Sequence, residues 1–186
     1  MARPTFAETQ LLVDSLLADN TTGAITPADV RQVFDAVTAL FQPATTGLTG
    51  IPGATIALTT TDTPLVIFDA SLQEVGEQGV IVPSVANDNI VSSLVGVHRF
   101  DFTTSIEGPN NDDVIVTLYR NGAATAVASE ISLRGAGNRV EFTMSFPLQG
   151  PAPGPNTYSL SARLRTGSGS ATFYNSIFAL GFIPGQ

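Results

Sequence analysis

The side chains that could carry out catalysis are few in this chain, and they are not grouped in the sequence. His98 is the only histidine, and there is no cysteine, so neither a thiol nucleophile nor a thiolate zinc site can form. A hydrolytic triad needs a nucleophile, a base and an acid that orients the base. No serine lies in a Gly-x-Ser-x-Gly turn. We therefore expect His98 to be a residue at the end of a strand, and we predict no catalytic residue.

Four carboxylates, Asp101, Glu107, Glu130 and Glu141, occupy polar positions that alternate with apolar ones. A glycosidase needs two carboxyl groups that face each other across a cleft, and the sequence leaves such a pair open. The polar positions of a half-buried strand usually face solvent. We expect these four side chains on solvated strand faces, and we predict that the protein is not an enzyme.

Two loops carry oxygen ligands that could bind a cation. The run Asn110-Asn111-Asp112-Asp113 is one, but these residue types are also common turn formers. Residues 18–29 lie between two predicted helices as an EF-hand loop would, yet the first ligand position is Ala18 and the last is Asp29. Calcium loops need several carboxylates and a bidentate glutamate at the end. We predict no bound metal ion and no cofactor.

Two helices joined by a turn are predicted within residues 6–41. Thr26 can cap the second helix, Pro27 suits its first position, and Asp29 stands where a capping box needs an acid. Apolar residues recur at three- and four-residue spacing, and the expected docking face consists of Leu12, Leu16, Val30, Val33, Phe34, Val37 and Phe41. Isolated short helices are marginal in water, so we expect residues 1–42 to form an anchor that docks on another surface.

Alternation of apolar and polar residues begins after residues 43–54, which are rich in Pro, Gly and Thr and are interpreted as a linker. Pro64–Phe68 and Gly79–Val82 are predicted strands with a polar loop between them. Asn121-Gly122 predicts a two-residue hairpin turn, because both residues tolerate positive φ. The regular spacing of strands and turns predicts an antiparallel, jelly-roll-like β-sandwich over residues 55–186. The fold class is therefore mainly β with a short N-terminal helical hairpin.

The last predicted strand, Ala171–Ile183, is apolar at both odd and even positions. A strand of this kind must be covered on both faces. It could be a central strand beneath a long loop. Alternatively, one face fills the core while the other meets identical copies about a symmetry axis, with the contact residues expected to be Phe173, Tyr174, Ile177, Phe178, Leu180 and Phe182.

The composition limits the choice of partners. The net charge is −8, and all eight basic residues are arginine. This acidity argues against nucleic acid and against an anionic membrane surface. The N-terminal residues lack the apolar segment of a signal peptide, and no apolar run is long enough to span a membrane. We expect a protein that is made in a cytoplasm and remains soluble.

Two stretches resemble known families. The run from Asn20 to Arg31, Asn-Thr-Thr-Gly-Ala-Ile-Thr-Pro-Ala-Asp-Val-Arg, is similar to an N-terminal helical segment of tailed-bacteriophage virion proteins. The β region, which ends Ile-Phe-Ala-Leu-Gly-Phe-Ile-Pro at residues 177–184, resembles trimeric jelly rolls of the tumour-necrosis-factor and complement-head type. Phages use such jelly rolls as capsid decoration proteins and as fibre heads.

These resemblances imply a homotrimeric capsid decoration (cement) protein, made in the host cytoplasm and located in the virion. Its expected partners are its own copies and the major capsid protein or another virion protein. Two alternatives remain open, a tail-fibre or baseplate receptor-binding protein and a glycan-binding or glycan-processing domain. On a phage particle we expect residues 1–42 to attach the protein and the β-sandwich to face outward.

Overall fold

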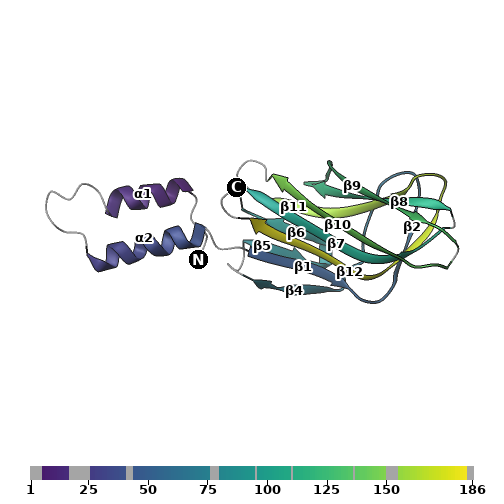
Figure 1. Ribbon diagram of the computed structural model, residues 1–186, viewed down its shortest axis with the longest axis horizontal. Coiled ribbons are helices and arrows are strands. Elements are labelled where there is room, and N and C mark those ends of the chain that lie inside the picture. The colour runs from purple at the N-terminus through teal and green to yellow at the C-terminus, as the bar shows by residue number, and fades with distance from the viewer. Residues whose placement is uncertain are drawn as a thin grey trace.

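The computed structural model describes residues 6–16, 26–40, 44–75, 80–94, 96–109, 111–135, 137–149 and 155–183. They form a helical pair followed by two antiparallel sheets packed face to face (Figure 1). The helices are α1 (Phe6–Leu16) and α2 (Pro27–Leu40), and a short 3-10 turn covers Val85–Asn87. No helix in the described ranges is long and apolar enough to cross a membrane.

The first sheet has the strand order β10-β7-β12-β1-β4, and β2 pairs with the remaining part of β12. Its strands are β1 (Ala44–Gly50), β2 (Ala54–Leu58), β4 (Ala70–Val75), β7 (Val97–Glu107), β10 (Val140–Gln149) and β12 (Gly169–Ile183). The second sheet has the order β5-β6-β11-β8-β9, and β3 pairs with β11. Its strands are β3 (Thr63–Pro64), β5 (Ile81–Ser84), β6 (Asn89–Ser92), β8 (Asp112–Arg120), β9 (Ala123–Leu133) and β11 (Asn156–Leu164).

The core lies between the two sheets and is built from the alternate residues of their strands. Phe100 and Phe102 of β7 and Leu48 of β1 are almost fully buried on one side, as are Leu118 and Tyr158 on the other. Phe100 packs on Tyr158 across the interior, with ring centroids 4.8 Å apart. The predicted antiparallel sandwich is therefore confirmed.

Local turn chemistry was predicted correctly at two places. Asn121 and Gly122 have φ values of 51° and 78° and join β8 to β9 as a tight hairpin. Thr26 caps α2: its hydroxyl accepts from the backbone N–H of Asp29 at 3.3 Å, and Asp29 accepts from the Thr26 backbone N–H at 2.8 Å. The pKa of Asp29 lies below its usual value, first because its carboxylate accepts from the Thr26 backbone N–H and second because it accepts from the Thr26 hydroxyl at 2.8 Å.

The interpretation of residues 43–54 as a linker was wrong for most of their length. Residues 44–50 form β1, which pairs with β12 on one side and β4 on the other. The segment lacks an alternating apolar pattern because two of its inward positions hold Thr46 and Gly50 instead of large apolar side chains. The expected polar loop after residue 68 likewise contains β4, whereas the expected strand Pro64–Phe68 is reduced to the pair Thr63–Pro64.

The final strand contains a β-bulge that the sequence pattern did not reveal. Asn175 has φ 49°, and the register with β7 shifts between Tyr174 and Ile177, so that two residues oppose one. Phe173 faces the core before the bulge, and Phe178 and the alternate residues after it face the core as well. The apolar side chains at odd positions before the bulge and at even positions after it therefore lie on the same buried face of β12.

Candidate functional site

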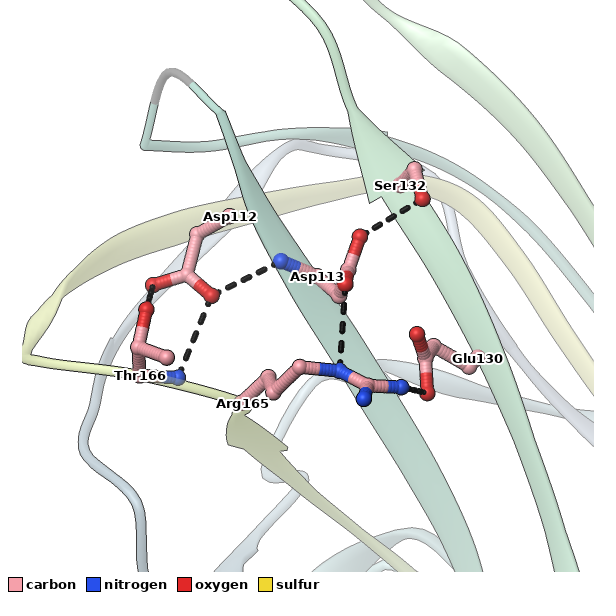
Figure 2. Close-up of polar contacts among 6 residues, drawn as sticks. All are labelled: Asp112, Asp113, Glu130, Ser132, Arg165 and Thr166. Atoms are coloured by element: carbon pink, nitrogen blue, oxygen red, sulfur yellow. Dashed lines mark hydrogen bonds and ion pairs between the residues drawn. The ribbon is translucent and has the colours of Figure 1, made fainter.

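The carboxylates of the Asp112–Asp113 turn join three segments of the second sheet (Figure 2). Asp112 Oδ1 accepts from the backbone N–H groups of Asp113 at 2.8 Å and Thr166 at 3.2 Å, and its Oδ2 accepts from the Thr166 hydroxyl at 3.2 Å. Asp113 Oδ1 accepts from the Ser132 hydroxyl at 2.6 Å. These bonds clamp the start of β8 to β9 and to the residues that follow β11.

Arg165 is held between two carboxylates beside this turn. Its Nε lies 3.1 Å from Asp113 Oδ2, and its Nη2 donates to Glu130. The hydrogen bond from Ser132 is the main reason why the pKa of Asp113 lies below its usual value. The Glu130 hydrogen bond raises the pKa of Arg165. The described part of the predicted cation loop is thus an ion-paired turn, while its first residue, Asn110, lies outside the described residues, as do residues 18–25 of the calcium-like loop.

His98 is the second residue of β7, so its predicted place at a strand end is confirmed, but its side chain is fully buried. Ser92 Oγ lies 2.8 Å from His98 Nε2, and the ring is packed against Phe100, Tyr158 and Phe182. Burial lowers the pKa of His98, and the Gly96 backbone weakly opposes this shift. Nδ1 has no well-formed hydrogen bond within the described ranges. A serine and a histidine without access to solvent are part of the core.

The other carboxylates considered for catalysis lie on the outer face of the first sheet, away from Glu130. Asp101 pairs with Arg99 at 3.1 Å, and Glu107 pairs with Arg139 at 3.7 Å. Glu141 accepts from the hydroxyl of Ser105 at 2.6 Å. Each of the three therefore has a partner on its own sheet, while Glu130 belongs to the outer face of the second sheet and does not face them.

Four of the predicted contact residues on β12 serve the protomer's own core. Phe173, Phe178, Leu180 and Phe182 are between 0% and 9% exposed, so the prediction that they meet a second copy was wrong for this protomer. Phe178 packs on Phe68 and Phe100 with centroid distances of 6.2 and 6.5 Å. Tyr174 and Ile177 are the two predicted contact residues that lie on the outer face, and Ile177 is 41% exposed.

On the outer face of β12, the neighbouring residues on β1 are small, and those on β7 are Thr103 and the ion pair of Arg99 and Asp101. Ile177 lies between Thr103 of β7 and Thr49 of β1, and Ala179 lies between Asp101 and Gly47. A Cβ atom on Gly47 would lie 2.7 Å from the Phe178 carbonyl oxygen and 2.9 Å from Leu72 Cδ1, so only glycine fits beneath the Leu72 side chain. We call this surface the β12 outer strip; it consists of Thr45, Gly47, Thr49, Leu72, Thr103, Ile177, Ala179 and Gly181.

Tyr174 closes one end of the β12 outer strip and is locked in place. The guanidinium carbon of Arg139 lies 3.7 Å from the centroid of the Tyr174 ring, a cation–π contact. The Tyr174 hydroxyl donates to Glu107 at 3.5 Å. A Cβ atom at Gly53 would lie 2.3 Å from the ring, so the backbone of this glycine packs directly on it. Sequence analysis missed Leu72, Gly53 and Arg139 because only the strand register brings them to this face.

The predicted anchor face is divided between the helix–helix contact and solvent. Val33 is buried, Leu12 and Val37 are half-buried, and Val30 and Phe34 are 39% and 67% exposed. The side chain of Leu16 and the whole of Phe41 lie outside what the structure describes. Figure 1 shows the two helices side by side beyond one end of the sandwich, and the described helices pack on each other rather than on a sheet.

Comparisons with known proteins define the fold. No protein-family model matches the sequence, and no curated protein matches it. Among solved structures, the chain is similar to murine APRIL, with a TM-score of 0.52 and 7% identity over 76% of this chain and 99% of that one. It is equally similar to the TNF Eiger from S. frugiperda, with a TM-score of 0.52 and 10% identity over 78% and 95%. The chain has the jelly-roll fold of tumour-necrosis-factor-like proteins.

A third similar structure is the globular domain of the zebrafish complement 1qA protein, with a TM-score of 0.46 and 12% identity over 75% of this chain and 95% of that one. The two structures with TM-scores of 0.52 confirm, at the level of fold, the resemblance of the β region to jelly rolls of the tumour-necrosis-factor type. At these identities the likeness identifies the jelly roll and does not identify what it binds.

Proposed function

We propose that this jelly roll assembles as a homotrimer and serves as a bacteriophage virion structural protein, with capsid decoration as its main role. The observation that carries the proposal is the β12 outer strip. Ile177 and Leu72 remain 41% and 38% exposed, and the residues between them are small and mostly uncharged. A flat, charge-poor surface of this kind allows two backbones to approach closely and suits a contact with another copy.

The jelly-roll likeness is consistent with self-association, since the type that the sequence resembles is trimeric. The assignment to a phage particle rests on the similarity of residues 20–31 to the helical segment of virion proteins. The described helices support a separate attachment role, because they stand apart from the sandwich and expose Leu11 and Phe34, at 69% and 67%. We assign the helical hairpin to binding on a capsid or other virion protein.

A receptor-binding fibre or baseplate protein is the second candidate, and it rests on the same exposed hairpin. In both roles the hairpin attaches and the sandwich faces outward, but a decoration protein binds heads at fixed stoichiometry and stabilises them. A receptor-binding protein instead binds host cells. We assign no catalytic role to either face of the sandwich.

The test uses the full-length protein and phage heads stripped of it. Phe34→Asp adds a charge to the exposed apolar side of the hairpin, and Val66→Asp is the matched control because Val66 of the sandwich is 68% exposed. We expect both variants to remain folded trimers in light scattering. Phe34→Asp should fail to co-sediment with heads, whereas Val66→Asp should bind like the original protein. Normal binding of Phe34→Asp would assign attachment to another surface, and binding to cells but not to heads would favour the receptor-binding role.

A further inference from the structure

The outer face of the second sheet contains a shallow hollow of about 410 Å³. Strand register forms it: Arg163 of β11 stands opposite Ile115 of β8, and Ile115 stands opposite Glu130 of β9. Ala128 lies two residues before Glu130 on the same side of β9. Because the Ala128 side chain is small, it leaves the space of the hollow beside Ile115 and Glu130. Ser129 and Arg165 complete the lining.

Charged groups rim the hollow and are already oriented by ion pairs. Arg165 is fixed by Asp113 and Glu130, as Figure 2 shows. Arg163 Nε lies 3.3 Å from Asp62 Oδ1, and Asp62 Oδ2 accepts from the Tyr119 hydroxyl at 2.7 Å. The side chain of Arg163 is 36% exposed, so its guanidinium group remains accessible from solvent. The hollow thus offers N–H donors held in place by their neighbours.

The balance of charges selects the kind of ligand. Two guanidinium groups and three carboxylates leave this region with one net negative charge, and the whole chain carries −8. An anion gains little in such a field. A sugar is neutral, and its hydroxyl groups accept from guanidinium N–H groups and donate to carboxylates. Its C–H face can lie on Ile115 and Ala128.

We propose that this hollow binds one residue of a neutral glycan. The volume falls at the low end of the range for small-molecule sites, which is about 300–1,000 Å³, and this fits one sugar ring of a longer chain. Arg163 donates to ring hydroxyls, Glu130 and Asp62 orient the two guanidinium groups, and Ala128 leaves space for the ring. The site lies on the opposite sheet from the β12 outer strip.

The test is a titration of the ¹⁵N-labelled full-length protein with the methyl glycosides of glucose, galactose, mannose and N-acetylglucosamine. We expect one of them to shift the backbone amide signals of Ile115, Ala128 and Ser129 in a saturable way at millimolar concentration. Arg163→Met should weaken this binding at least about ten-fold, since it removes hydrogen bonds from a charged donor. Arg99→Met is the matched control, because it breaks an exposed ion pair on the other sheet.

Ala128→Leu provides a second variant that fills the hollow without touching an ion pair, and it should abolish the shifts. Absence of saturable shifts with all four glycosides would overturn the proposal. The proposal would also be overturned if Arg163→Met and Ala128→Leu both bound the sugar as well as the original protein does. The sugar would then bind at another place. Either negative result would leave the trimer and its attachment to heads unaffected.

Discussion

Two adjacent residues of β12, Ile177 and Phe178, allow folding to be separated from assembly, because they point to opposite faces of one strand. Phe178 is fully buried between Phe68 and Phe100. Truncation of a buried phenylalanine to alanine costs about 3–5 kcal/mol, out of a total stability of roughly 5–15 kcal/mol for a domain. Phe178→Ala should therefore lower the free energy of unfolding strongly.

Ile177 lies on the outer side and is 41% exposed, so Ile177→Asp places a charge where a single protomer can solvate it. In an isolated protomer we expect a cost of about 1 kcal/mol, the span of strand propensities. In a trimer the same carboxylate would be buried without a partner, which costs about 3–5 kcal/mol. Since about 1.4 kcal/mol is a factor of ten, assembly should weaken by two or more orders of magnitude.

The assay combines light scattering at micromolar concentration with urea unfolding at matched protein concentrations, because the stability of an oligomer depends on concentration. Val82→Asp is the control for Ile177→Asp, since Val82 is 43% exposed but lies on the edge strand β5 of the second sheet. We expect Ile177→Asp to give folded protomers and Val82→Asp to remain trimeric. A trimeric Ile177→Asp protein, or an original protein that is monomeric, would refute the assignment of the β12 outer strip.

Three further predictions concern acid, capping and metal ions. Burial lowers the pKa of His98, so below about pH 6.5 the unfolded chain binds a proton that the folded protein does not. The free energy of unfolding should therefore fall towards lower pH, by at most about 1.4 kcal/mol per pH unit. Urea titrations at pH 7.5 and 5.5 measure this pH dependence, and His98→Gln should abolish it. Thr26→Val should cost about 1 kcal/mol of helix stability, visible as reduced helicity in circular dichroism. EDTA should leave the melting temperature unchanged, and a fall of many degrees would contradict our interpretation of the Asp112–Asp113 turn.

Sequence reasoning succeeded where a few neighbouring residues determine the structure. The Asn121-Gly122 hairpin needs two residues that tolerate positive φ, and both are adjacent. The α2 cap needs a hydroxyl and a carboxylate three residues apart, as Thr26 and Asp29 are. In β7, Phe100, Phe102 and Ile106 alternate with polar residues, and this period of two is visible in the sequence itself. Each of these features is encoded within about ten residues.

Features that depend on partners far along the chain were missed. The β1 strand shows no alternation because Gly50 must fit against the Ile67 carbonyl and buried Thr46 donates to the Leu72 carbonyl, and both contacts form only in the folded sheet. The burial of His98 depends on Tyr158 and Phe182, which come from two other strands. The hollow on the second sheet requires Arg163, Ile115 and Glu130 to align across three strands. Composition and periodicity contain no information about such a register.

The bulge at Asn175 determines which residues of β12 are available to a second copy. Phe173 faces the core, so an unbroken strand would turn its odd-numbered residues inward and would expose Phe178, Leu180 and Phe182. The extra residue reverses this parity, and buried Thr104 stabilises it: its hydroxyl donates to the Tyr174 carbonyl at 3.2 Å and lies 2.9 Å from Ser176 Oγ. The large side chains therefore fill the core, and the small ones form the flat outer strip. The proposed contact surface and the well-filled interior are consequences of the same backbone irregularity.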